Sequence, residues 1–248
     1  MRLQLSTWQE VDSYLEASRG IIIPIGSTEQ HGPNGLIGTD AICPEVIALA
    51  AAAQCGALVG PTVSVGMAQH HLGFSGSVAL RPTTLIAVVR DYVLSLARNG
   101  FERFYFLNGH GGNIATVNAA FSEIYAERSF APSGSQPDLR CKLANWFGFP
   151  SVIEISKELY ADRDGSHATP SEISVTQAAY PEAIKASNIE PAPPRPRPFY
   201  DADDYRKIHP DGRIASDSAA ATPQAGHRLI EASAASVVTD YQGFLAEI

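Results

Sequence analysis

The sequence predicts an α/β fold in which helices cover both faces of a mainly parallel sheet. Short apolar runs rich in β-branched and aromatic residues, such as Ile21–Ile25 and Phe104–Leu107, are typical of buried strands. Longer segments with helical periodicity separate these runs along the chain. This alternation favours successive βαβ units, whose helices pack on the two faces of one sheet.

The first expected elements are a capped helix and a buried strand. Thr7 and Glu10 have the spacing of a capping box, which predicts a helix from this point to about Ser18. Gly20 ends that helix, and the apolar strand Ile21–Ile25 follows it. The chain therefore reaches its first strand after a single helix.

The next elements continue the alternation. Ala41–Gln54 is rich in alanine and leucine and predicts a helix, and Ala57–Val65 predicts a second buried strand. A polar, glycine-rich loop over Gly66–Gly76 then carries His70 and His71.

The middle of the chain repeats this pattern. Pro82–Arg98 has apolar residues at helical spacing, and Asn99-Gly100 stops the helix. The elements expected after it are, in order, the strand Phe104–Leu107, the turn Asn108–Asn113, a helix over about Ile114–Arg128 and the strand Leu139–Trp146.

The last part of the chain is less regular. Ile189–Tyr200 contains PAPPRPRP, which prefers extended polyproline geometry and cannot form a central strand. Thr222 and Pro223 have the chemistry of a helix start, and that helix is expected to run to about Leu245. The segment after the prolines is too short for its own core. We therefore expect one domain over residues 1–248, with a proline-rich excursion at about 189–215 that could pack on another subunit.

Composition excludes some classes of partner. The chain has 248 residues, a formal charge of −8 and a pI of about 5.3, so neither a nucleic acid nor an anionic membrane is an expected partner. Cys43, Cys55 and Cys141 are few and unpaired by spacing, which favours a reducing compartment over a disulfide scaffold. The N-terminus lacks the apolar core of a signal peptide, and no apolar stretch is long enough to span a membrane. A cytoplasmic protein is expected.

Candidate metal ligands follow the ends of predicted strands. The loop after Ile25 holds Glu29, His31 and Asp40, and the turn after Leu107 holds His110. Ligands at the carboxyl ends of parallel strands converge on one crevice. A lone histidine in a glycine-rich turn is more often a hydrogen-bonded loop residue, so none of these residues defines a site alone.

A third segment, SHATPSE, carries His167 and Glu172. Thr169 and Glu172 also have capping-box spacing with Pro170 at the first helical position, so the residues alone leave Glu172 open between helix cap and metal ligand. Taken jointly, two histidines and three acidic residues after strand ends suit a pair of divalent ions such as Zn²⁺ or Mn²⁺. His70 and His71 are read first as polar loop residues and second as ligand or substrate contacts.

Other catalytic signatures do not appear. No glycine-rich phosphate loop or dinucleotide fingerprint follows a predicted strand, because Asn108–Asn113 lacks a Lys-Ser/Thr pair. No G-x-S-x-G elbow is present, and no cysteine has a nearby histidine partner.

Three blocks of the sequence closely resemble those of the creatininase family of metal hydrolases. They are PIGSTEQHGP with the following GTD, then LNGHGGN, then SHATPSE. The segment HLGFSGSVALRPTT is similar to the stretch that the family has between the first two blocks. The resemblance runs from about Ile21 to Thr176, and the three blocks in order are highly specific.

The resemblance implies a three-layer α/β/α domain with a mainly parallel sheet, usually assembled as a hexamer. It also implies a site for two metal ions, Zn and/or Mn with Fe possible. By position, Glu29 and His110 would hold one ion, His31 would hold the other and Asp40 would bridge them. His167 matches the family's active-site histidine, which is expected to pass a proton to the leaving nitrogen.

Two departures bear on the substrate. Creatininase proper has a glutamate ligand two residues after the histidine of the second block, where this chain has Gly112. Other branches take that ligand from the third block, which favours Glu172 as a ligand that also caps a helix. Creatininase proper also covers the substrate ring with a tryptophan before the third-block histidine, but Asp162–Ser166 has no aromatic residue. Trp146 is the alternative aromatic wall, or a core residue.

The function expected from the residues and the resemblance is hydrolysis of a C–N amide bond by a metal-bridging hydroxide. The substrate would be creatinine or a related cyclic amide, with His167 as general acid/base near its ordinary pKa. Arg163, His70 and His71 are further candidates for substrate contact. The alternatives are a formamide deformylase acting on a ribosylaminopyrimidine intermediate and a relative that binds metal without catalysis.

Overall fold

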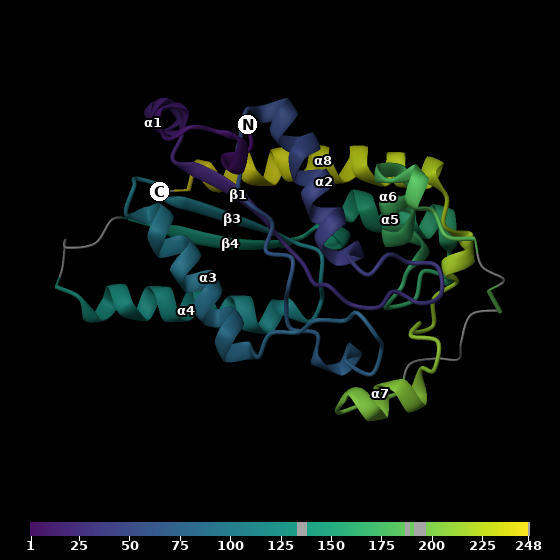
Figure 1. The fold of residues 1–248 in the computed structure, drawn as a ribbon. Coiled ribbons are helices and arrows are strands. Elements are labelled where there is room, and N and C mark those ends of the chain that lie inside the picture. The colour runs from purple at the N-terminus through teal and green to yellow at the C-terminus, as the bar shows by residue number, and fades with distance from the viewer. Residues whose placement is uncertain (133–137, 187–188, 191–196, 248) are drawn as a thin grey trace.

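A central sheet lies between two layers of helices (Figure 1). The structure is a computed structural model that describes residues 1–132, 138–186, 189–190 and 197–247. Its sheet contains β1 (Gly20–Ile25), β2 (Leu58–Val59), β3 (Arg103–Asn108) and β4 (Arg140–Asn145). The order across the sheet is β2-β1-β3-β4, and every paired strand is parallel. The expected fold class is confirmed.

The two sides of the sheet are both buried, which explains the continuous apolar strands. One side packs on α3 (Pro82–Ala97) and α4 (Asn113–Phe130), and the other packs on α2 (Thr39–Cys55), α5 (Pro150–Tyr160) and α8 (Pro223–Leu245). Alternate residues of β1 and β3 point to opposite sides, so Ile22 and Tyr105 face α2 and α8, whereas Ile21 and Phe104 face α3 and α4.

The second strand is shorter than the sequence predicts. The expected strand Ala57–Val65 is reduced to β2, followed by one isolated bridge between Val63 and Ile25. The amide of Gly60 still donates to the carbonyl of Ile22 at 2.8 Å, but Pro61 has no N–H and interrupts the ladder.

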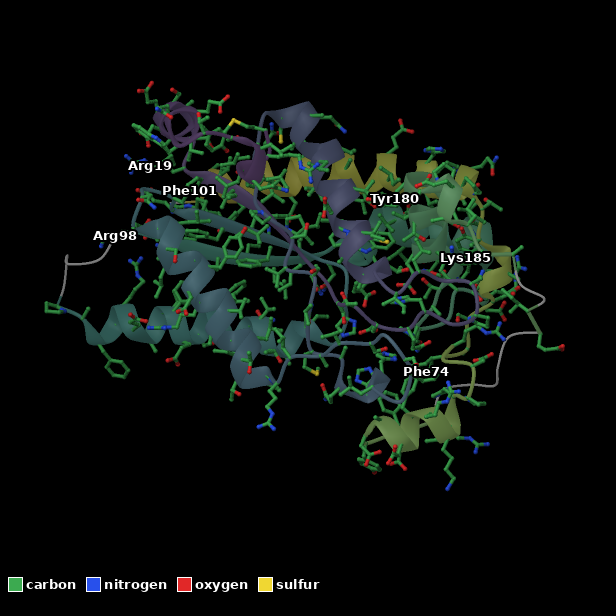
Figure 2. All side chains as sticks on the ribbon, viewed as in Figure 1. Arg19, Phe74, Arg98, Phe101, Tyr180 and Lys185 are labelled. Atoms are coloured by element: carbon green, nitrogen blue, oxygen red, sulfur yellow. The ribbon has the colours of Figure 1, made fainter. Side chains whose placement is uncertain are left out.

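Most of the remaining elements lie around the carboxyl ends of the strands. They are α6 (Pro170–Ala179), α7 (Ala202–Ile208) and the short 3-10 turns Gln69–His71, Trp146–Gly148, Pro181–Ala183 and Ser218–Ala220. At the other end of the sheet, α1 (Trp8–Ala17) precedes the amino end of β1, and the 3-10 turn Leu3–Leu5 follows Arg2, which forms a bridge with Val59 of β2 (Figure 1). The sequence pattern did not indicate α5 or α7. Figure 2 shows Phe74 beside α7, where the guanidinium carbon of Arg206 lies 4.1 Å from the centre of its ring.

The sequence also led to expectations about a proline-rich excursion and about membrane-spanning segments. Residues 191–196 of the proline-rich stretch lie outside the described residues, so the path of that excursion stays a prediction. Judged by length and hydropathy, no helix in the described part of the chain qualifies as a membrane span.

Candidate metal centre

The start of α2 packs very closely on the ends of β1 and β3. A Cβ atom on Gly26 would lie 2.0 Å from the carbonyl oxygen of Asp40, and one on Gly109 would lie 2.1 Å from the same oxygen. Pro44, one turn later in α2, has no N–H to donate to that carbonyl. Two glycines and a helical proline therefore bring the first turn of α2 against the strand ends. Asp40, expected in a loop, lies in that turn.

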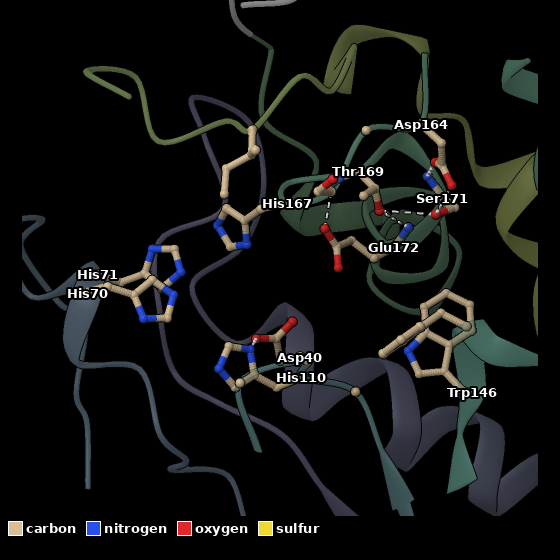
Figure 3. Close-up of a pocket in the computed structure, with 17 residues that line it drawn as sticks. Asp40, His70, His71, His110, Trp146, Asp164, His167, Thr169, Ser171 and Glu172 are labelled. Atoms are coloured by element: carbon tan, nitrogen blue, oxygen red, sulfur yellow. Dashed lines mark hydrogen bonds and ion pairs between the residues drawn. The ribbon is translucent and has the colours of Figure 1, made fainter. Parts of the chain in front are cut away.

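Five predicted ligands meet at this edge of the sheet. Glu29 and His31 come from the loop after β1, His110 follows β3, and Glu172 lies in the first turn of α6. Figure 3 shows Asp40, His110 and Glu172 facing one cavity. Glu29 and His31 are fully or almost fully buried beside them.

Asp40 lies between two groups of ligands. Its Oδ1 is 3.0 Å from Nε2 of His31, and its Oδ2 is 2.9 Å from Nδ1 of His110. Ligand atoms of Glu29, Asp40 and His110 all lie within 4.8 Å of one another, and so do those of His31, Asp40 and Glu172. Each carboxylate oxygen of Asp40 thus faces a different half of the cluster.

The backbone fixes which ring nitrogen of each histidine faces Asp40. Nδ1 of His31 donates to the carbonyl of Glu29 at 3.1 Å, which leaves Nε2 toward Asp40. Nε2 of His110 donates to the carbonyl of Met67 at 3.0 Å, which leaves Nδ1 toward Asp40. Histidines that bind metals typically donate their second ring N–H in this way.

Glu29 supports the same interpretation. Its side chain is completely buried, and neither carboxylate oxygen accepts a hydrogen bond from the described residues. The nearest nitrogens belong to His71 at 3.1 Å and His110 at 3.4 Å. A buried carboxylate without donors is costly unless a cation neutralises it, so these residues fit a divalent metal ion.

Glu172 has both of the roles that its sequence position left open. The Thr169 amide donates to its Oε1 at 2.6 Å, and its own amide donates to Oγ1 of Thr169 at 3.2 Å, which completes the capping box. Its Oε2 lies 3.8 Å from Nε2 of His31. One oxygen caps α6 while the other faces the ligand cluster.

The protonation of the cluster reflects its concentration of acidic groups. Burial alone would lower the pKa of His31, but Asp40 and Glu172 raise it to about 10. Burial also opposes the charge on His110, whose pKa Glu29 and Asp40 raise to about 9. Burial raises the pKa of Glu172 to about 7, against the effect of His31. Without a cation, the cluster therefore retains protons that compensate its carboxylates.

His167 lies beside the cluster and is held by the chain that precedes His31. Its Nε2 donates to the backbone carbonyl of Gln30 at 2.8 Å, and its Nδ1 lies 3.6 Å from Oε1 of Glu29. Burial, followed by the nearby His31, lowers the pKa of His167 well below its ordinary value. The expectation of an ordinary pKa for this residue was therefore wrong.

The cluster opens into a cavity of about 420 Å³. Trp146, His70 and His71, three of the residues proposed from the sequence to contact the substrate, line this cavity. The structure does not bring Arg163 there, because its guanidinium points to Asp217 at 3.2 Å.

Two residues with roles at the site were not singled out from the sequence. The side-chain amide nitrogen of Gln30 lies 3.0 Å from His71 and 2.9 Å from the carbonyl of Gly212. Asp164 lines the cavity. In the sequence, only the position of Gln30 between the candidate ligands Glu29 and His31 indicated that it lies at the site. Asp164 belongs to the stretch Asp162–Ser166, whose lack of an aromatic residue was the one feature used.

Comparisons with known proteins agree with the geometry. The model of the creatininase family, described as creatinine amidohydrolase, matches residues 4–240. Creatinine amidohydrolase of Pseudomonas putida is 28% identical over 205 residues, which cover 79% of this chain and 78% of that protein. The mycofactocin precursor peptide peptidase of Mycolicibacterium smegmatis is 36% identical over 106 residues, which cover 40% of this chain and 42% of the peptidase.

Solved structures of creatininase share the fold. A manganese form is 22% identical, has a TM-score of 0.85 and covers 99% of both chains. A Zn–Zn form of a creatininase mutant is 22% identical, has a TM-score of 0.84 and covers 99% of this chain and 98% of that one.

Proposed function

This chain belongs to the creatininase family, and from that premise we propose that it is a metal-dependent amidohydrolase that cleaves a C–N amide bond of a small molecule, creatinine or a related cyclic amide. One observation carries the proposal: each oxygen of the Asp40 carboxylate faces a separate group of candidate ligands. Such an arrangement suits a pair of divalent cations, as in two-metal hydrolases.

The roles of the ligands follow from their positions. Glu29 and His110 would hold one ion, His31 and Glu172 would hold the other, and Asp40 would contact both. Glu172 would take the place of the side chain that Gly112 lacks. A Cβ atom at Gly112 would lie 2.4 Å from Nε2 of His110, so a ligand at that position would displace His110.

Bound cations would supply Lewis-acid polarisation of the amide carbonyl and a water of lowered pKa. Glu29, Asp40 and Glu172 would offset the charge of the ions. Nδ1 of His167, held in place by the bond from Nε2 to Gln30, would accept a proton and deliver it to the leaving nitrogen. Trp146, His70 and His71 would form the walls of the substrate cavity.

Peptides are a second candidate class of substrate. The local identity of 36% to a peptide peptidase favours this class over part of the chain. The reaction would be the same C–N hydrolysis, so the ligands and His167 would keep their roles.

The proposal is tested by metal analysis joined to hydrolysis assays. We expect His110→Ala to lose about one metal equivalent and nearly all hydrolysis of the best substrate from a panel of creatinine, cyclic amides, formamides and short peptides. His227→Ala, on the exposed side of α8, is the matched control and should retain both. Unchanged metal content and full activity in His110→Ala would overturn the scheme.

A further inference from the structure

A buried amide outside the ligand cluster joins loops from two neighbouring strands. Asn113 is the first residue of α4, and its side chain is completely buried. Its Nδ2 donates to the carbonyl of Gly26 at 2.9 Å, in the loop after β1. Its Oδ1 accepts from the amide of Met67 at 3.0 Å, in the loop after β2. The hydrolytic scheme assigns this residue no role.

The same amide also holds the turn after β3, which carries His110. Nδ2 of Asn113 donates to Oδ1 of Asn108 at 3.3 Å, and that oxygen also accepts from the amide of His110 at 3.1 Å. Both N–H bonds and the carbonyl of the Asn113 side chain are therefore paired. An amide turned the other way would bring its NH₂ against the N–H of Met67 and its oxygen against the carbonyl of Gly26, so one orientation is fixed.

Met67 connects Asn113 to the metal centre. Its amide is held by Oδ1 of Asn113, and its carbonyl accepts from Nε2 of His110 at 3.0 Å. That bond leaves Nδ1 of His110 toward Oδ2 of Asp40, at 2.9 Å. An imidazole that donates one N–H to a fixed carbonyl presents its other nitrogen to a metal in a fixed direction. Asn113 can therefore act on the metal centre through the position of Met67.

Glycines leave the space that this contact needs. A Cβ atom on Gly112 would lie 2.4 Å from Nε2 of His110 and 2.7 Å from the carbonyl oxygen of Met67. One on Gly66 would lie 2.3 Å from Oδ1 of Asn113. Because glycine lets a backbone approach closely, the loop after β2 can reach both the ring of His110 and the amide of Asn113.

We propose that Asn113 is a positioning residue that holds the Met67 carbonyl against Nε2 of His110 and so keeps Nδ1 of His110 directed at one of the two ions. This inference rests on the proposed function for the presence of the ions. The second ion should not depend on Asn113, because its ligand His31 is fixed separately, by the bond from its Nδ1 to the carbonyl of Glu29.

The alternative is that Asn113 only stabilises the fold. Asn113→Ala removes the acceptor for Met67 and the donor to Gly26, whereas Asn113→Asp loses the donor but keeps the acceptor. Both variants should be less stable, but only Asn113→Ala should release Met67. Asn118→Ala is the matched control, because Asn118 is an exposed residue of the same helix whose amide donates to the carbonyl of Ile114 at 2.8 Å.

The experiment follows the ring protons of two histidines by NMR on protein labelled with nitrogen-15 at histidine. Spectra of the metal-free and the zinc-loaded protein give the rates at which the Nε2 proton of His110 and the Nδ1 proton of His31 exchange with water. His110→Ala and His31→Ala assign the two signals. Stepwise titration with Zn²⁺ gives a dissociation constant for each ion, and thermal melting measures the stability of every variant.

We expect Asn113→Ala to speed exchange of the His110 proton about tenfold, the scale of one lost hydrogen bond. It should also weaken the binding of one zinc ion about 10–100-fold, the usual effect of losing the support of a metal-binding histidine. The His31 proton and the other ion should be unchanged. Asn113→Asp should keep the His110 proton protected although it melts at a lower temperature, and Asn118→Ala should change none of these quantities.

Three results would overturn the inference. They are a His110 proton that stays protected in Asn113→Ala, equal acceleration at His31, which would indicate general loosening, and loss of protection in Asn113→Asp. Because exchange is also measured without metal, it tests the contact between Met67 and His110 even in a protein that binds no zinc. Absence of zinc binding by the unsubstituted protein would instead contradict the proposed function.

Discussion

At the scale of single residues, the geometry is compatible with two roles for His167, metal ligand and proton carrier. Its Nδ1 lies close enough to Glu29 and His31 for the three residues to form a third possible metal-binding group. Its Nε2 is bound to the carbonyl of Gln30, as expected of either a ligand or a fixed proton carrier. Metal content and rate distinguish these two roles.

We predict that His167→Ala keeps the full metal content but lowers kcat by about 10²–10⁴-fold, the usual contribution of a positioned general acid/base. Elemental analysis and steady-state kinetics on the same sample measure both quantities. His110→Ala provides the contrast, because it should lose metal as well as activity. Loss of a metal equivalent from His167→Ala would instead identify His167 as a ligand.

The residue types and spacing in the sequence were sufficient to propose Glu29, His31, Asp40, His110 and Glu172 as one cluster, and the fold brings all five together. Local pattern could not decide between cap and ligand for Glu172, because the distance from its Oε2 to His31 depends on how α6 packs against α2. Arg163 shows the converse limit. Its position in the chain suggested the cavity, but a partner distant in sequence, Asp217, draws its side chain away.

At the scale of elements, the close approach of α2 to the strand ends is what places Asp40. Gly109 permits this approach, since its missing Cβ would lie 2.1 Å from the Asp40 carbonyl and 2.7 Å from Cδ of Pro44. Both contacts are with parts of α2 that cannot move without shifting the helix.

We predict that Gly109→Ala destabilises the protein by about 1–3 kcal/mol, the usual cost of overpacking, and weakens metal binding by shifting Asp40. Chemical denaturation and metal titration measure the two effects. Gly111→Ala is the control for stability, because a Cβ there meets nothing within 4 Å. Equal stability of the two variants would contradict the role assigned to Gly109.

Helix and strand positions were predictable where one periodicity dominates, as in β1, β3, α3 and α8. The prediction was less accurate where tertiary contacts override a local pattern. Val63 remains beside β1 although Pro61 ends the regular ladder, so an apolar run that reads as one strand becomes a short strand and a bridge. The seven-residue α7 is too short to show a helical period, and its burial depends on Tyr205 packing near His71.

At the scale of the whole molecule, the assembly suggested by the family resemblance stays a prediction. Several large apolar side chains are exposed on the single chain, including Phe130 at 91%, Tyr200 at 88% and Trp8 at 71%. Scattered exposed apolar residues are normal on a monomer, so these do not establish a hexamer. Contacts between subunits are formed by surfaces that combine residues distant in the sequence, so no local sequence pattern predicts how the subunits are arranged.

The ligand cluster joins β1, α2, β3 and α6, so metal binding should stabilise the fold as a whole. A ligand that binds only the folded state at about a hundred times its dissociation constant adds about 2.7 kcal/mol. For a chain of this length, that corresponds to a melting temperature about 5–10 °C higher. We therefore predict that removing the metal with a chelator lowers the melting temperature by this amount and that added Mn²⁺ restores it. The shift should be smaller in His110→Ala, which has lost part of the site. Identical melting of the metal-loaded and chelated protein, with the metal contents verified by elemental analysis, would show that the four elements are held together without the ions.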